Sequence, residues 1–266
     1  MNLASIDSAA TRGESWLHKA APWAKLSAFA LVLAAVIVNW NLLVLAAIGL
    51  VLAAVVASSR APAGLAFSLA LYPAIFAAIF AFSAAPDVIT GAVIILKAIV
   101  AALAAVTMML TTPYPQVFAP LQRIVPGIVG DALLMTYRST FLLLGKFANL
   151  MTAMRLRAGL SAGRPLRTAR STARALAGTL LYSIDLAQRD HDIMRLRGYE
   201  SRLRVTAVRS ASVPIDVTLV AVAAGIAVAS TASRVWAETL NPYTWIAPAA
   251  AALLFVAVIT IGRKSR

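Results

Sequence analysis

The longest uncharged stretch of the chain, from Leu26 to Ala57, constrains the fold more than any other feature. It runs for 32 residues without a charge, whereas one helix needs only about 20 apolar residues to cross a bilayer. The tripeptide Asn39-Trp40-Asn41 in its middle is a turn signal with an aromatic ring suited to the membrane interface. We therefore predict two membrane-spanning helices joined as a hairpin, with Lys25 extending the first by snorkelling to the headgroups.

Further apolar segments predict more spans of the same kind. The chain is 61% hydrophobic, whereas soluble domains are usually about half apolar. The predicted fold class is therefore all-α, a polytopic membrane protein with about six transmembrane helices. Lys97 falls inside the fourth span, where an interior-facing or snorkelling lysine is the main interpretation and a functional intramembrane charge is the alternative. The four further spans cover about Leu65–Ser83, Val88–Leu110, Val217–Ser233 and Trp245–Ile261.

Positive charge gathers in one internal region of the chain. Residues 112–212 hold 15 Lys and Arg against 5 Asp and Glu, a net charge of +10 out of the chain's +14. Positive charge accumulates on the cytoplasmic side of membrane proteins, so we expect this region and both termini to be cytoplasmic, at the inner (plasma) membrane. The predicted domains are 1–111, an N-terminal arm with four spans; 112–212, a cytoplasmic region; and 213–266, the last spans and a basic tail.

Two long amphipathic helices are predicted inside this basic region, one from about Val129 to Ala158 and one after Pro165. In each, side chains recur at steps of three and four, which is typical of a helix with one apolar stripe. Such helices can lie along the membrane or on each other rather than span it. The first stripe is Leu133, Tyr137, Thr140, Leu144, Phe147, Met151 and Met154, and the second is Ala169, Ala173, Leu176, Leu180, Ile184, Ala187, His191 and Met194.

Each long helix ends on the same tetrapeptide, Met-Arg-Leu-Arg, which occurs at 154–157 and again forty positions later at 194–197. A glycine follows each copy, at Gly159 and Gly198. One interpretation is that these arginines meet acidic lipid and the helix dipole. The other is that each end inserts an arginine into a groove of a partner, where a guanidinium pairs with a carboxylate through two hydrogen bonds. Two such ends could engage two copies of one partner.

The sequence offers little for catalysis. It contains no cysteine and two histidines, and it lacks a Gly-rich phosphate loop, a Gly-x-Ser-x-Gly elbow and a His-Glu-x-x-His zinc motif. Asp190 and Asp192 straddle His191, so on a helix they point in different directions and do not face one cation. We expect a solvated acidic face with a packed His191, and no catalytic residue, metal site or cofactor.

Several segments resemble the transmembrane T component of energy-coupling factor (ECF) transporters, particularly the cobalt-transporter type. The resemblance covers most of the chain, including His18–Leu26, Thr112–Pro115, Leu134–Arg138 and Met194–Tyr199. The family's signature is two Ala-Arg-Gly-like motifs at the ends of cytoplasmic coupling helices. Leu196-Arg197-Gly198-Tyr199 fits it with leucine in the alanine place, and Leu156-Arg157-Ala158-Gly159 departs further, with alanine where glycine is usual.

The resemblance implies a subunit that is not itself an enzyme. It implies docking of two cytoplasmic ABC ATPase subunits, and coupling helices that cradle a separate substrate-binding membrane (S) subunit, for uptake of a micronutrient such as cobalt, nickel or a vitamin. The key arginines are Arg157 and Arg197. The candidate docking residues are Met154, Arg155, Arg157, Ala158 and Gly159 at the first end, and Met194, Arg195, Arg197, Gly198 and Tyr199 at the second.

Two other classes of protein remain as alternatives. One is a membrane-anchored protein whose basic segment binds anionic lipid or nucleic acid through distributed charge. No nucleic-acid-binding motif accompanies the charge, so nucleic acid is not an expected partner. The other is a membrane enzyme of lipid metabolism, which the missing set of facing carboxylates disfavours.

Overall fold

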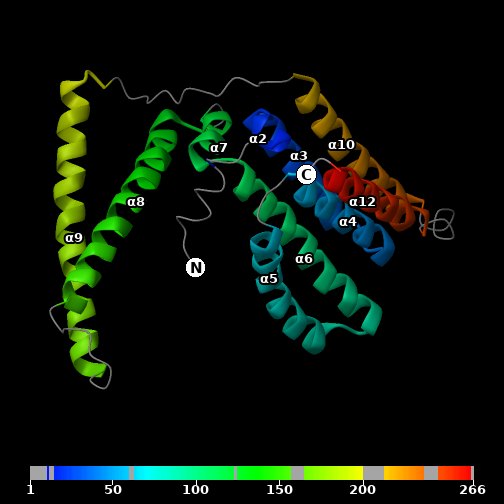
Figure 1. Ribbon diagram of the computed structural model, residues 1–266, viewed down its shortest axis with the longest axis horizontal. Helices are drawn as coiled ribbons and strands as arrows, with labels where there is room; N and C mark the ends of the chain where they lie inside the picture. The colour runs from blue at the N-terminus through cyan, green and yellow to red at the C-terminus, as the bar shows by residue number, and fades with distance from the viewer. Residues whose placement is uncertain are drawn as a thin grey trace. The chain divides into compact units, whose positions relative to one another are not determined.

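The computed structural model describes residues 11, 15–59, 63–122, 125–156, 165–199, 213–236 and 245–264, and every regular element in them is an α-helix (Figure 1). The polytopic, all-α fold class is confirmed. In chain order the helices are α2 (Trp16–Lys19), α3 (Pro22–Val38), α4 (Leu42–Ser58), α5 (Ala63–Ala84), α6 (Val88–Thr111), α7 (Tyr114–Leu121), α8 (Gly127–Leu156), α9 (Pro165–Leu196), α10 (Val213–Val235) and α12 (Ile246–Lys264).

The hairpin predicted around Asn39-Trp40-Asn41 is present as α3 and α4. Asparagine side chains build its turn, because their oxygens satisfy backbone groups that a helix end leaves open. The Asn39 side-chain oxygen accepts a hydrogen bond from the Asn41 backbone N–H at 2.7 Å, and the Asn41 oxygen accepts one from the Leu43 N–H at 2.9 Å. The 32-residue uncharged block is therefore divided where the sequence predicts.

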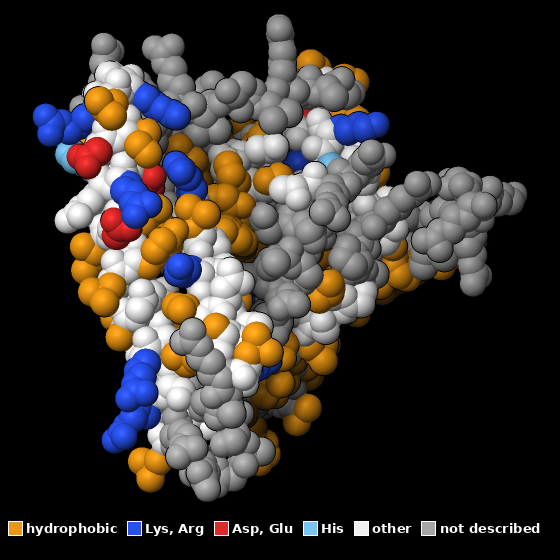
Figure 2. Space-filling model, turned by 60° about the vertical axis from the view of Figure 1, so that its left-hand side comes forward, with side chains coloured by type: hydrophobic (Ala, Val, Ile, Leu, Met, Phe, Trp, Pro, Cys, Tyr) orange, Lys and Arg blue, Asp and Glu red, His pale blue; other side chains and the backbone are white. Residues whose placement is uncertain are grey.

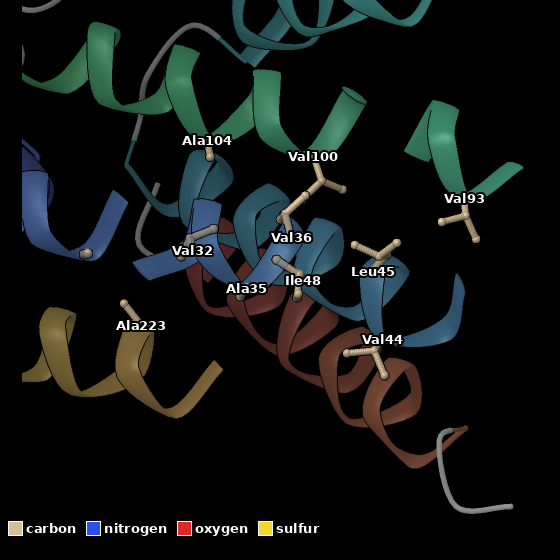
Figure 3. Close-up of a cluster of buried hydrophobic side chains, with 11 residues drawn as sticks. Val32, Ala35, Val36, Val44, Leu45, Ile48, Val93, Val100, Ala104 and Ala223 are labelled. Carbon is tan, nitrogen blue, oxygen red and sulfur yellow. The ribbon is translucent and has the colours of Figure 1, made fainter. Parts of the chain in front are cut away.

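The chain forms two compact units, and the first comprises Met1–Val117 and Ala207–Arg266. Inside it α3 packs on α10, α4 on α12, α5 on α6, and α6 on both α3 and α4. Figure 3 shows valine, alanine, leucine and isoleucine side chains from α3, α4, α6 and α10 converging in a core cluster. Alanine and valine dominate it, and small side chains let membrane helices approach closely.

By length and composition, four described helices are long and apolar enough to cross a membrane. They are α6, α8, α10 and the part of α5 from residue 64 to residue 84. Shorter apolar helices are α3, α4 and the segment Ile246–Val256 of α12. A 17-residue helix such as α3 is about 26 Å long, slightly below the roughly 30 Å of a hydrocarbon core. α8 is the least apolar of the four and carries Asp131, Arg138, Lys146 and Arg155.

Lys97 and Arg234 both hold the carboxyl-terminal end of α3. The Lys97 ammonium donates to the Ile37 carbonyl at 3.0 Å and lies 4.0 Å from the centre of a Trp40 ring. Arg234 donates to the Val38 carbonyl at 2.8 Å. Cations favour helix carboxyl termini, where carbonyl groups lack helical partners. These contacts agree with the main interpretation of Lys97, an interior-facing or snorkelling lysine.

Lys25 does not snorkel, so that expectation is wrong. The residue is only 5% exposed, and its ammonium donates to the Thr111 carbonyl at 3.0 Å and to the His18 carbonyl at 3.4 Å. The carboxyl end of α6 supplies the first carbonyl, so a helix terminus replaces the headgroups as partner. At the amino end of α3, a carboxylate oxygen of Asp216 accepts the Ala21 backbone N–H at 2.7 Å.

Candidate functional site

The second compact unit, Phe118–Thr206, is built on α8 and α9. These two helices run side by side in opposite directions (Figure 1). Three contacts mark the register of the two helices: Arg138 with Asp190 at 3.6 Å, Lys146 with the ring of Tyr182 at 4.9 Å, and Leu150 Cδ1 at 3.7 Å from a Cβ placed on Gly178. From the first of these contacts to the last, each advance along α8 equals the retreat along α9.

The antiparallel register and the forty-residue repeat combine to give the hairpin a local two-fold axis. Moving each member of the Arg138–Asp190 pair by forty positions onto the other helix gives the Gly178–Leu150 pair. The axis passes near Leu144 and Ile184. The first Met-Arg-Leu-Arg copy begins ten residues after Leu144, and the second begins ten residues after Ile184. The repeated motif therefore occupies two equivalent positions at opposite ends of one hairpin.

The described parts of the two motifs are exposed to a similar extent. Met154 and Met194 are both half-buried, and the arginines that follow them are both exposed. Leu156 is 84% exposed and Leu196 is 88% exposed. In the observed register the helix ends are separated by about 24 residues of helix, or roughly 36 Å. Each end thus presents an exposed leucine beside an arginine, and no other part of the described unit covers that leucine.

The carboxyl end of α9 is closed by a Schellman motif centred on Gly198. This glycine has a φ of 67°, in the left-handed region that costs an L-residue with a side chain energy. The Tyr199 N–H donates to the Met194 carbonyl at 3.1 Å, and the Gly198 N–H donates to the Arg195 carbonyl at 3.1 Å. This is the paired bonding that defines the motif. Gly198 therefore fixes the direction of the chain immediately after Arg197.

The first end is described only as far as Leu156. Arg157, Ala158 and Gly159, which belong to the predicted docking set, lie outside the described residues. At the second end, Met194, Arg195, Arg197, Gly198 and Tyr199 all lie within them and come together in the last turn of α9 and its cap.

The Tyr199 side chain reaches across from the end of α9 to α8. Its hydroxyl donates a hydrogen bond to the carboxylate of Asp131, near the start of α8. That hydrogen bond is the main reason why the pKa of the Tyr199 phenol is raised above its ordinary value. Asp131 is only 4% exposed, and a buried carboxylate needs hydrogen-bond donors.

The apolar stripe predicted for α9 is not the face that packs on α8. Leu176, Leu180 and Ile184 are 52%, 66% and 58% exposed, whereas Ala175 and Gly178 are buried or half-buried. Small residues lie against α8 because they permit close approach of two helices. His191 belongs to the same exposed stripe, so the expectation that it is packed is wrong.

Basic side chains are spread along the hairpin between apolar ones, and acidic side chains gather toward one end (Figure 2). Asp185 forms an ion pair with Arg189 at 2.6 Å, and Asp190 faces Arg138. In the described part of the chain no group of three or more potential ligands converges as a metal site. Asp185 and Asp190 therefore act as partners of arginine.

An apolar cavity of about 100 Å³ lies in the first unit, between α3, α4, α6 and α10. Its lining is apolar apart from Lys25, Thr107 and Thr111. Lys25 already donates to two backbone carbonyls. Pockets for polar substrates need several convergent polar groups, so this lining is better suited to a hydrocarbon chain than to a polar substrate.

Three residues important to this geometry were missed in the sequence. Leu156 and Leu196 stand inside the repeated tetrapeptide, and their equivalent positions were a usable signal for a shared role. Asp131 lies 68 positions from its partner Tyr199, and no spacing rule connects them.

The comparisons with known proteins identify one family. The family model described as "Cobalt transport protein" (CbiQ) matches residues 13–207, which include both motif copies and the whole α8–α9 hairpin. The cobalt transport protein CbiQ of Rhodobacter capsulatus is 33% identical over 111 residues, which are 41% of this chain and 45% of that relative. The aligned segment thus spans less than half of the relative's length.

Proposed function

The chain belongs to the cobalt transport protein (CbiQ) family, and on that premise we propose that it is the transmembrane coupling component of an ECF-type importer. In this role it is a non-catalytic subunit. It transmits ATP-driven motion of two cytoplasmic ATPase subunits to a separate substrate-binding membrane subunit. The cargo is a micronutrient, either a transition metal ion such as cobalt or a vitamin, and nucleotide binds to the ATPase subunits.

The local two-fold symmetry of the α8–α9 hairpin carries this proposal. A symmetric pair of proteins presents the same surface twice, related by a two-fold axis. The hairpin carries the same motif twice, at opposite ends of an axis near Leu144 and Ile184. One hairpin can therefore meet two ATPase subunits through equivalent contacts, one at each end.

The chemistry of each end suits a protein groove. Exposed leucine next to arginine combines apolar area with a planar donor, and arginine is enriched among the residues that anchor protein interfaces. We expect the groove on each ATPase subunit to have apolar walls for Leu156 or Leu196. We expect a carboxylate at its base, because guanidinium and carboxylate pair through two parallel hydrogen bonds.

The exposed stripe of α9 supplies a surface for the membrane subunit. Leu176, Leu180 and Ile184 leave large apolar side chains uncovered within their unit, and apolar helix faces of this size favour a partner or a lipid surface. In this proposal ATP binding draws the two ATPase subunits together. The hairpin moves with them, because its ends are fixed in their grooves, and the stripe transmits that movement to the substrate subunit.

We place the protein in the inner (plasma) membrane. Its α8 and α9 helices and both termini then lie on the cytoplasmic side. α8 meets the length and composition criteria for a span, but Arg138, Lys146 and Arg155 are distributed along it. Each costs about 2.5–3.5 kcal/mol at the centre of a bilayer on insertion scales. The six other apolar helices in the described part of the chain, α3, α4, α5, α6, α10 and α12, account for the spans.

Binding of the ATPase subunits to alanine variants tests the proposal. Arg157→Ala/Arg197→Ala should insert into membranes normally but bind the ATPase pair at least about tenfold more weakly, since each arginine loses a charge-assisted pair. The matched control is Lys146→Ala/Arg189→Ala, which removes two exposed cations closer to the middle of the hairpin. Equal losses in the two double variants would contradict specific docking and favour a general electrostatic surface for anionic lipid.

A further inference from the structure

The hydrogen bond between Tyr199 and Asp131 joins the carboxyl-terminal cap of α9 to the first turns of α8, at the second end of the hairpin. Asp131 belongs to the second turn of α8, and Tyr199 is the residue that follows the Schellman glycine of α9. Tyr199 is 38% exposed, whereas its partner Asp131 is 4% exposed. The contact therefore fixes a surface tyrosine to a buried carboxylate of the neighbouring helix.

This contact lies directly beside the docking arginine. Arg197 precedes Gly198, whose left-handed backbone sets the path of the chain, and Tyr199 follows it. Rotation of the chain at Gly198 would move both neighbours. With the Tyr199 side chain held by Asp131, the cap is fixed at its outer end as well as by its backbone bonds.

We propose that Asp131 and Tyr199 form a latch that holds Arg197 in its docking position before the ATPase subunit arrives. The inference rests on the proposed function, because it takes the end of α9 as a docking site. Tyr199 is then a positioning residue, and its hydroxyl acts through Asp131 rather than on the ATPase. A pre-organised end binds more tightly, because less conformational entropy is lost on docking.

The latch makes the two docking ends unequal. The forty-residue relation places Gly159 where the second end has Tyr199, and Ser171 where it has Asp131. A glycine has no side chain to form such a bond. Ala158 likewise stands where the second end has Gly198. The carboxylate–phenol pair therefore belongs to the second end.

The protonation state of the phenol supports this role. A tyrosine phenol already holds its proton at neutral pH, and the hydrogen bond to Asp131 raises the pKa of Tyr199 further. The donor is thus present throughout the physiological range.

A double-mutant cycle on the complete complex with its ATPase pair tests the latch. The variants are Tyr199→Phe, Asp131→Ala and the two combined, with Tyr182→Phe as control, because that tyrosine contacts Lys146 through its ring. Tyr199→Phe and Asp131→Ala should each weaken ATPase binding about three- to tenfold. The double variant should bind the ATPase pair no more weakly than the single variant with the lower affinity, because both substitutions remove the same contact.

Asp131→Asn provides a conservative variant, since its amide oxygen still accepts the phenolic proton, and it should restore most of the affinity lost in Asp131→Ala. If Asp131→Ala fails to fold, Tyr199→Phe carries the test, because it removes only the hydroxyl that donates to Asp131. Wild-type affinity in Tyr199→Phe, or losses that multiply in the double variant, would overturn the latch. Arg197→Ala, measured alongside, separates the two proposals: wild-type binding by that variant would overturn the docking assignment itself.

Discussion

At the scale of single residues, the docking end depends on one glycine. Gly198 was identifiable in the sequence, because a glycine after a helical run is a common carboxyl cap. Its φ of 67° and its paired backbone bonds give that signal a defined geometry. The partner of the next residue, Asp131, was not predictable, since a contact across 68 positions depends on the packing of α8 against α9.

Gly198→Ala should weaken ATPase binding while leaving the membrane helices intact. The left-handed backbone costs a residue with a Cβ about 1 kcal/mol or more, so the cap would relax and Arg197 would lose its fixed position. Hydrogen exchange should become faster at the amides of residues 197–199 and remain unchanged in α3 and α6. Unchanged exchange at the cap together with full binding would argue against a role for this geometry.

At the scale of elements, helices and hairpins followed well from the sequence, but their contact faces did not. The division of the uncharged block at Asn39–Asn41 was readable, because the turn chemistry is local. The apolar stripe of α9 was also readable, yet Leu176 and Ile184 are exposed and the small residue Gly178 faces α8. A stripe indicates which face avoids water, and it does not identify the surface that covers it.

Two glycines should respond in opposite ways to replacement by alanine. A Cβ on Gly178 would lie 3.7 Å from Leu150 Cδ1, an ordinary contact, whereas on Gly49 it would lie 3.1 Å from Val100 Cγ2. Gly178→Ala should therefore stabilise its helix by about 0.5–1 kcal/mol, because glycine is unfavourable inside helices. Gly49→Ala should destabilise the α4–α6 contact by about 1–3 kcal/mol through overpacking. Thermal unfolding in detergent compares the two variants, and a lower stability for Gly178→Ala than for Gly49→Ala would refute this packing.

At the scale of the whole molecule, contacts distant in sequence hold the membrane unit together. Asp216 binds the amino end of α3 across 195 positions, and Arg234 binds its carboxyl end across 196. Both ends of α3 are thus fixed by residues of α10. The sequence predicts the helices that take part, but it gives no sign of this pairing, because charges that complement a helix terminus carry no marker of their partner.

The account's central claim is that one hairpin docks two ATPase subunits, one at each end. The chain has no cysteine, so single cysteines can be introduced without a background reaction. Thr152 and Asp192 are exposed, equivalent under the forty-residue repeat, and outside both motifs, and Ile184 at the midpoint serves as control.

The most direct measurement is short-range crosslinking from Thr152→Cys, Asp192→Cys and Ile184→Cys in the complete complex. We predict an ATPase adduct from each end position, a product carrying two ATPase subunits from the doubly substituted chain, and none from Ile184→Cys. Adducts from the midpoint as abundant as those from the ends, or an adduct from one end alone, would contradict two-ended docking.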